Sequence, residues 1–168
     1  MPLTAGYPHP EYIETREWLS QHLNDPNVRV VDGRSADDYA KGHILGAILA
    51  PSPLFKAADG METCSAEDFA AAAGQMGIRP SDTVIAYEPA GAGAGRVWWA
   101  FERFGHPTVR YLPGGLKAWQ AAGLPVSTER STYPPVRYDL QQTHDDMACS
   151  LPQAKSFVGR SPGSIRLP

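Results

Sequence analysis

The stretch Ile85–Phe101, IAYEPAGAGAGRVWWAF, contains the clearest structural signal in this 168-residue chain. An apolar run ends at Tyr87, a glycine-rich loop follows it, and a segment rich in aromatic residues begins at Gly95. A strand, a glycine loop and a helix in this order form a common cradle for an anion, because loop amides and the first helical turn point at the same place. The stretch therefore predicts a strand–loop–helix unit with a candidate anion site.

Short apolar segments alternate with helical segments on both sides of this unit. Strands are predicted at 28–31, 47–50, 83–87 and 109–112. Helices are predicted at 16–24, 36–41, 65–76, 95–104 and 116–122, with Thr15 and Ser65 as N-caps, and a turn is predicted at 42–46. Short apolar strands that alternate with helices are typical of a parallel sheet covered on both faces. The sequence thus predicts an α/β fold.

Composition excludes several classes of function. Apolar residues make up 42% of the chain, enough for a core, and the net charge is −3. The fifteen basic residues form no run, so nucleic acid and membrane surfaces are not predicted as partners. No apolar run of about 18 residues and no signal-peptide pattern occurs, so we expect a soluble, cytoplasmic protein. Cys64 and Cys149 form no CxxC pair, and no metal or cofactor is predicted.

Two longer motifs carry a resemblance to a known family. They are VVDGRSADDYAKGHILGA at 30–47 and RVWWAFERFGHPTVRYLPGGLKAWQAAGLPV at 96–126. Together they resemble the rhodanese-like sulfurtransferases over roughly residues 12–127, with Leu45 and Pro113 departing from the family's proline and aspartate. The resemblance implies about five parallel strands with helices on both faces. It also implies a cysteine at the end of the central strand that accepts sulfur from thiosulfate or 3-mercaptopyruvate and passes it on from a persulfide.

That cysteine is absent from this chain. Glu88 follows the strand, and no cysteine occurs between Glu88 and Arg96. A carboxylate oxygen cannot form the exchangeable S–S link that sulfur transfer requires. The degenerate catalytic loop then consists of Glu88 with Pro89, Ala90, Gly91, Ala92, Gly93, Ala94, Gly95 and Arg96.

The glycine loop also fails to match other anion-binding motifs. It lacks the GxGxxG spacing of dinucleotide-binding folds, the Gly-Lys-Ser/Thr ending of a P-loop and the Cys-x5-Arg loop of phosphatases. A residual anion site and a purely structural turn both remain open. Glu88 either fills the loop as an internal anion, which we favour, or points to solvent.

The segment RVWWAFERFGH further resembles the first domain of two-domain thiosulfate and 3-mercaptopyruvate sulfurtransferases. In those proteins the N-terminal domain is non-catalytic and carries an acidic residue in place of the cysteine. The resemblance implies a rhodanese-like domain at 1–128, followed at 129–168 by a linker and an incomplete or degenerate start of a second domain. A catalytic rhodanese domain, or self-association through the uncovered cleft face, is the implied partner.

Three polar residues are candidate supporting residues. Asp32 and Arg34 follow a predicted strand, and a salt bridge that shapes the loop is expected there. His43 matches a histidine that assists chemistry near the cleft of the similar mercaptopyruvate enzymes, but here we expect it to bond the backbone. Arg96 is expected to lie at the start of the helix. Its side chain either faces the loop as a cationic substrate contact or has a structural role only. The aromatic residues of that helix are predicted to pack in the core.

Three candidate functions are compatible with these sequence features. The first is a supporting, non-catalytic sulfurtransferase domain. The second is a docking or regulatory module built on an inactive rhodanese fold. The third is an active sulfurtransferase that uses Cys64 or a partner's cysteine. Cys64 precedes a predicted helix start, where its pKa is expected to fall, but it is not at the family's catalytic position, so we favour a bystander thiol. Cys149 has no identifiable activating group nearby.

Overall fold

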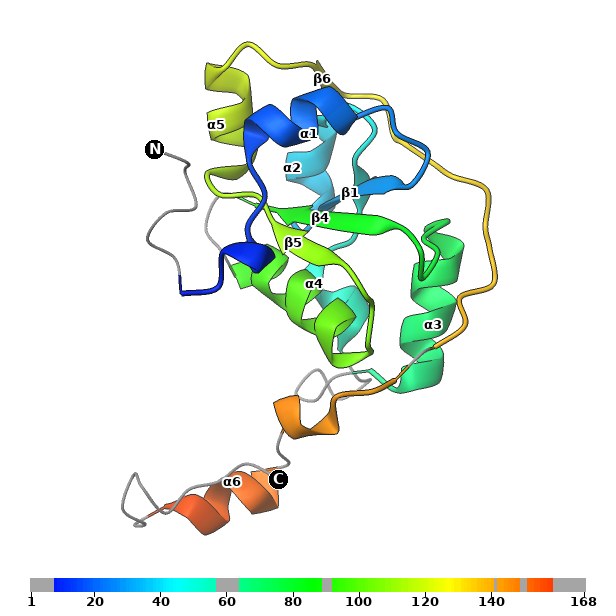
Figure 1. Cartoon of the computed structure of the whole chain (residues 1–168), viewed down its shortest axis with the longest axis vertical. Helices are drawn as coiled ribbons and strands as arrows, with labels where there is room; N and C mark the ends of the chain where they lie inside the picture. Colours follow the sequence, from blue (N-terminus) through cyan, green and yellow to red (C-terminus); the bar gives the residue numbers. More distant parts are fainter. Residues whose placement is uncertain (1–7, 57–63, 89–91, 141, 149–150, 159–168) are drawn as a thin grey trace.

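A four-stranded parallel sheet forms the centre of the molecule (Figure 1). The computed structural model describes residues 8–56, 64–88, 92–140, 142–148 and 151–158. The strand order is β3-β1-β4-β5, with β1 Val28–Asp32, β3 Ile48–Leu49, β4 Thr83–Tyr87 and β5 Val109–Tyr111. Beyond β5, Ile13 forms an isolated parallel bridge with Tyr111, in the position of a fifth strand. The predicted α/β class with a parallel sheet is confirmed.

Helices cover both faces of this sheet. Helices α1 Arg16–His22 and α5 Gly115–Ala121 pack on one face, and α3 Ala66–Gln75 and α4 Ala92–Arg103 pack on the other. The described residues also form α2 Ala36–Ala40 after β1 and α6 Leu151–Phe157, which lies apart from the sheet (Figure 1). Short 3-10 helices occur at η1 Pro10–Tyr12, η2 Ser52–Phe55 and η3 Asp145–Met147. The two predicted N-caps are confirmed, because the hydroxyls of Thr15 and Ser65 accept hydrogen bonds from backbone amides three residues on.

Two predicted boundaries were wrong. Helix α4 begins at Ala92 rather than at 95, because its first turn packs against the loop after β1. Residues 43–44, predicted as part of a turn, form β2 His43–Ile44, which pairs antiparallel with β6 Val126–Ser127. The partner strand lies more than 80 residues away in the sequence, so local patterns contain no signal for this pairing.

Each face of the sheet has its own core. Val84 and Ala86 of β4 point to one cluster, which contains residues of α3 and α4, whereas Ile85 and Tyr87 point to the other, which contains residues of α1 and α5. This alternation follows from the two-residue period of a strand that is buried on both faces. The expected core role of the α4 aromatics holds for Phe101, which is fully buried.

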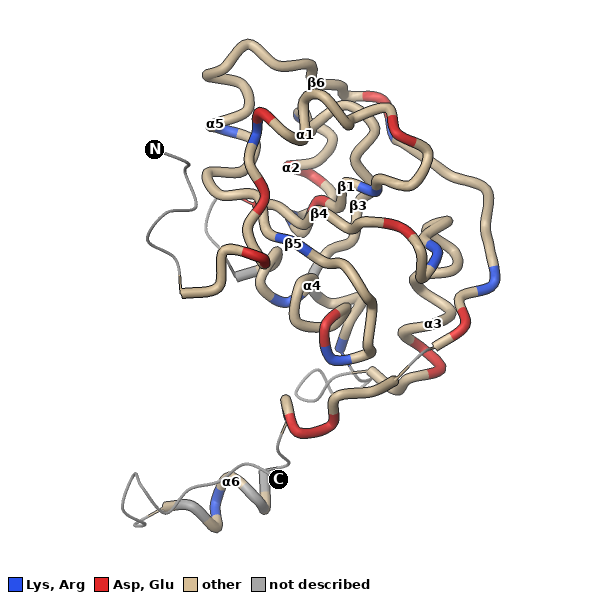
Figure 2. The backbone as a smooth tube through the Cα atoms, viewed as in Figure 1, with Lys and Arg blue, Asp and Glu red and all other residues tan. Residues whose placement is uncertain are grey.

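The distribution of charged residues and the lengths of the helices agree with the predictions made from the composition. Figure 2 shows Lys and Arg interspersed with Asp and Glu along the described backbone. None of the helices within the described ranges is both long and apolar enough to span a lipid bilayer.

Residues 131–140, here called the strap, lie against the domain (the yellow-to-orange trace in Figure 1). The Val136 amide donates to the Gly74 carbonyl over 2.9 Å, and the Tyr133 hydroxyl donates to the Gly46 carbonyl over 3.1 Å. Tyr138 is buried with its ring centroid 5.5 Å from that of Phe69. The domain boundary near 128 stays a prediction, and the strap contributes side chains to the core of the domain before it.

His106 connects the strap to the sheet. Its Nε2 lies 2.8 Å from the Asp82 carbonyl oxygen and its Nδ1 lies 2.8 Å from the Tyr138 hydroxyl. Because a carbonyl oxygen only accepts, Nε2 carries the proton, and Nδ1 of the neutral ring accepts from Tyr138. Burial lowers the pKa of His106 despite hydrogen bonding to Asp82, which acts in the opposite direction. The fold therefore favours the neutral imidazole.

Replacing Phe69 by alanine should destabilise the domain strongly. Phe69 is fully buried and its ring packs against Phe55, Phe101, Phe104 and Tyr138. A cavity at such a site costs about 3–5 kcal/mol, measured as the free energy of unfolding in urea. Leu54→Ala, at an exposed site, is the control and should change stability by less than about 1 kcal/mol. Similar losses for both variants would contradict the assigned core.

The contribution of His106 to stability should depend on pH. The unfolded chain protonates this histidine near 6.5, whereas the folded state resists protonation, so stability is fully present above that pH and is lost as pH falls through and below it. We expect the stability difference between wild type and His106→Gln to shrink between about pH 8 and about pH 5. Urea unfolding at both pH values measures it. A difference that does not change with pH would contradict the neutral, buried assignment.

Candidate functional site

The carboxyl ends of β1 and β4 form the edge at which the candidate residues meet. Asp32 and Tyr87 are paired in register, and the Gly33 amide donates to the Tyr87 carbonyl over 3.1 Å. Arg34 follows β1 and Glu88 follows β4. The parallel pairing therefore brings residues about 55 positions apart onto one edge, where loops of α/β proteins commonly bind ligands.

Asp32, Arg34 and Tyr87 form one hydrogen-bonded network. The Arg34 Nε atom lies 2.9 and 3.1 Å from the two carboxylate oxygens of Asp32, and Nη2 lies 2.6 Å from Oδ2. The Tyr87 hydroxyl donates to the same Oδ2 over 2.6 Å. The predicted salt bridge between Asp32 and Arg34 is thus present. Tyr87, which the sequence analysis identified only as the last residue of a strand, joins it through a hydrogen bond.

The network shifts the protonation of its members. Burial raises the pKa of the Tyr87 hydroxyl far above its usual value, and the neighbouring Asp32 carboxylate adds to the effect. Burial acts to lower the pKa of Arg34, but its hydrogen bonds and charge attraction to Asp32 outweigh burial and raise it. Tyr87 is therefore a fixed neutral donor and Arg34 a fixed cation, so neither serves as an acid or base near neutral pH.

The same network holds the segment that carries His43. Arg34 Nη2 donates to the Gly42 carbonyl over 2.6 Å, and the Ile44 amide donates to the Tyr87 hydroxyl over 3.1 Å. His43 is fully buried and its Nδ1 donates to the Tyr39 carbonyl over 3.0 Å, with the two rings stacked at 3.7 Å. The expected backbone bond of His43 is present. Within the described residues its Nε2 has no hydrogen-bond partner.

Glu88 lies in a cradle formed by three glycines. A side chain on Gly93 would collide with the Glu88 carboxylate, and one on Gly115 would come within 2.6 Å of the Glu88 carbonyl oxygen. A side chain on Gly33 would come within 2.8 Å of the Ala94 amide nitrogen in the first turn of α4. Only glycine permits these approaches of three separate elements. Glu88 is consequently 7% exposed, which rules out the solvent-facing orientation.

The Glu88 carboxylate adjoins the first turn of α4, where backbone amides favour negative charge. Its Oε1 atom is buried and has no hydrogen-bond partner within the described part of the chain. Residues Pro89, Ala90 and Gly91 lie outside the described residues. Whether the loop binds an anion therefore stays a prediction, and the internal position of the carboxylate agrees with the favoured orientation.

The remaining loop residues belong to α4. Gly93 and Ala94 are buried, whereas Gly95 and Arg96 are partly exposed. The guanidinium carbon of Arg96 lies 5.7 Å from the centre of the Trp99 ring, one helical turn further on. The described contact of Arg96 is thus with its own helix and not with the Asp32 network.

Cys64 is a residue of the core. It is 5% exposed, and burial raises the pKa of its thiol, with the nearby Asp68 carboxylate adding to the rise. The lowered pKa expected from its place before a helix was wrong, because loss of solvent outweighs the influence of the helix terminus. Cys149 lies outside the described residues.

A parallel sheet covered by helices on both faces, with close glycine contacts around Glu88 at its carboxyl edge, places this domain in the α/β class. The sequence pattern of the rhodanese-like domain matches residues 15–122, and the chain belongs to this family. The E. coli enzyme SseA, solved to describe the rhodanese fold of 3-mercaptopyruvate sulfurtransferases, shares the fold. Its TM-score is 0.76 at 23% identity, over 87% of this chain and 61% of that one.

Two curated relatives are similar in sequence. The sulfur carrier protein TtuD of Thermus thermophilus is 34% identical over 151 residues, which cover 80% of this chain and 48% of that protein. The thiosulfate sulfurtransferase of Corynebacterium glutamicum is 32% identical over 174 residues, which cover 98% of this chain and 54% of that protein. The chain therefore spans about half the length of these relatives.

Replacing Tyr87 by phenylalanine should destabilise the site edge, because it removes the hydroxyl and keeps the ring. The change leaves the buried Ile44 amide without its acceptor and removes one donor to Asp32, a loss of about 1–3 kcal/mol in unfolding free energy. Tyr12→Phe is the matched control, because within the described residues the Tyr12 hydroxyl has no hydrogen-bond partner. Its effect should stay within about 0.5 kcal/mol. Equal effects of the two changes would show that the network contributes nothing.

Proposed function

We propose that this chain is a non-catalytic, supporting domain of the thiosulfate/3-mercaptopyruvate type of sulfurtransferase. The observation that carries the proposal is the buried carboxylate of Glu88 at the end of β4, where the family's sulfur-carrying cysteine is expected. Sulfur transfer needs a thiolate that attacks the donor and then holds sulfur in an S–S bond. An oxygen acid in the same cradle provides negative charge but no sulfur chemistry.

The rest of the edge supports a structural contribution. Asp32, Arg34 and Tyr87 are bonded to one another and to the backbone around His43, so they hold the edge in one shape. No group among them is free to act as a nucleophile. A domain of this kind serves as one wall of a cleft whose chemistry comes from a second, catalytic rhodanese domain.

Two further observations are compatible with this function. The curated relatives TtuD and the Corynebacterium glutamicum enzyme are about twice as long as the matched region, which leaves room for a second domain in proteins of this type. Cys64 is buried with a raised pKa, which disfavours the thiolate that an alternative sulfur carrier would need.

The purified chain should form no thiocyanate from cyanide with either thiosulfate or 3-mercaptopyruvate. The assay is the colour of the iron–thiocyanate complex, with a competent rhodanese measured in parallel. Mass spectrometry after incubation with thiosulfate should show no added sulfur atom. Turnover above the blank that disappears in Cys64→Ala would overturn the proposal in favour of Cys64, and turnover that persists in Cys64→Ala would point to Cys149.

A thiol placed at position 88 gives a positive test of the same assignment. In Glu88→Cys the new thiolate should attack the outer sulfur of thiosulfate, release sulfite and retain one sulfur atom as a persulfide. The added mass and the released sulfite are both measurable. Glu88→Ser is the matched control and should retain none. If both variants fold and Glu88→Cys takes up no sulfur, position 88 is not the family's sulfur position.

A further inference from the structure

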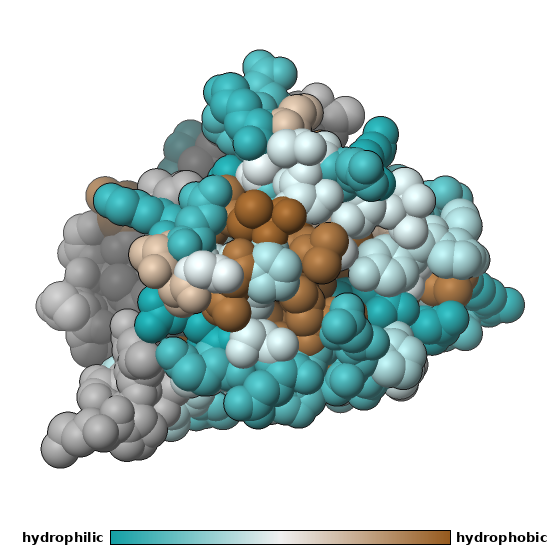
Figure 3. All heavy atoms as spheres, turned by 90° about the horizontal axis from the view of Figure 1, so that it is seen from above, coloured by the Kyte–Doolittle hydropathy of each residue, from teal (hydrophilic) through white to brown (hydrophobic). Residues whose placement is uncertain are grey.

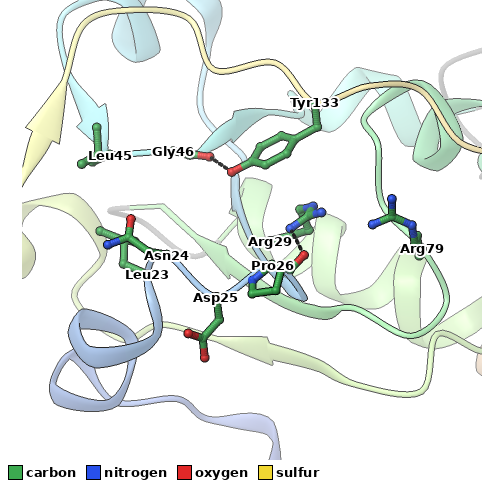
Figure 4. Close-up of a pocket in the computed structure, with 9 residues that line it drawn as sticks. All are labelled: Leu23, Asn24, Asp25, Pro26, Arg29, Leu45, Gly46, Arg79 and Tyr133. Carbon is green, nitrogen blue, oxygen red and sulfur yellow. Dashed lines mark hydrogen bonds between the residues drawn. The ribbon is translucent and has the colours of Figure 1, made fainter.

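A pocket of about 470 Å³ lies at the amino edge of the sheet, at the opposite end of the strands from Glu88. Arg29, the second residue of β1, lines the pocket from its buried side (Figure 4). The segment before β1, the turn after β2 and the strap form its walls. Its volume is within the range of sites that bind small molecules. It is not part of the network around Asp32, and the proposed sulfurtransferase role does not use it.

Arg29 is held rigidly at the floor of the pocket. Its Nη1 donates to the carbonyls of Pro26 and Val28, each over 2.9 Å, and its guanidinium carbon lies 4.4 Å from the centre of the Tyr133 ring. The Asp82 carboxylate lies 3.6 Å from Nε and offsets part of the charge. Arg29 therefore provides a fixed, partly neutralised cation beneath the opening.

Arg79 carries the positive charge that is available to a ligand. Its backbone amide donates to Asp82 over 2.9 Å, but within the described residues its exposed side chain has no hydrogen-bond or ion-pair partner. Figure 4 shows Arg79 on the same side of the pocket as Arg29, while the Asp25 carboxylate is directed away from both. The mouth of the pocket therefore presents a guanidinium group, which matches the planar geometry of a carboxylate.

The opposite wall is apolar. Leu45 is 42% exposed and Leu23 is partly exposed, and both line the pocket. Figure 3 shows apolar side chains gathered on the face of the molecule that is seen from above. The Leu45 amide donates to the Pro125 carbonyl over 3.2 Å, which fixes this wall to the segment that leads into β6.

The strap completes the pocket. Tyr133 lines it, stacks on Arg29 and donates its hydroxyl hydrogen bond to Gly46 in the turn after β2. The pocket is thus assembled from four segments of the chain, 23–29, 45–46, Arg79 and Tyr133, and a hydrogen bond ties the strap to the turn after β2. Hydrogen bonds at Arg29 and Tyr133 hold two of its walls in place, which lowers the entropic cost of binding.

We propose that this pocket binds a small organic carboxylate. The carboxylate pairs with Arg79 at the mouth, and the apolar part of the ligand lies against Leu23, Leu45 and the edge of the Tyr133 ring. Binding needs no chemistry from the carboxyl edge of the sheet, so the site is separate from the proposed sulfurtransferase role.

The test uses benzoate as the probe and benzamide as its uncharged counterpart, followed by NMR titration of the full chain. We expect benzoate to shift the signals of Leu45 and Tyr133 with a Kd on the order of 1 mM, and benzamide to bind at least about tenfold more weakly. Arg79→Ala should weaken benzoate about tenfold and leave benzamide unchanged. Because Arg79 is exposed, this variant should fold normally, which its melting temperature checks.

Arg137→Ala is the matched control variant. Arg137 is an exposed arginine on the strap that pairs with Asp139 and does not line the pocket, so its loss should leave benzoate binding unchanged. Equal affinities for benzoate and benzamide, an unchanged benzoate affinity in Arg79→Ala, or no shift of either residue up to about 10 mM would each overturn the proposal.

Discussion

The buried carboxylate of Asp32 is the constraint on which the edge of this domain depends. A charge with no solvent exposure costs several kcal/mol unless it is paired and hydrogen-bonded. Arg34 and Tyr87 meet that requirement from the loop after β1 and from the end of β4. Because the same two side chains also bond the backbone of Gly42 and Ile44, the pairing of one carboxylate fixes three segments at once.

Glu88 lies next to this network but belongs to a different environment. Gly33 and Gly93 let the loop after β1 approach the first turn of α4, and Gly93 and Gly115 let the first turns of α4 and α5 approach Glu88. Converging loop amides and a helix N-terminus can stabilise an anion. In this chain the same convergence surrounds the buried carboxylate of Glu88, on which the proposed supporting role rests.

The strap gives the domain a second organising feature at its other side. It contributes Tyr138 to the core beside Phe69 and Tyr133 to the pocket at the amino edge. The two edges of the sheet therefore differ in the interactions that shape them. The carboxyl edge is closed by paired charges and glycine contacts, whereas the amino edge remains open and presents the guanidinium of Arg79 beside apolar side chains.

The amino-acid sequence was enough to predict the fold class, most element positions and a glutamate, Glu88, directly after the central strand. Those features follow from local periodicity, N-caps and motif spacing, all of which are readable within short windows. Four features became visible in three dimensions: Tyr87 bonds to Asp32, β2 pairs with β6, Cys64 is buried, and the strap lines a pocket. Each of these depends on contacts between residues far apart in the chain, and burial and pairing at such contacts outweigh local preference.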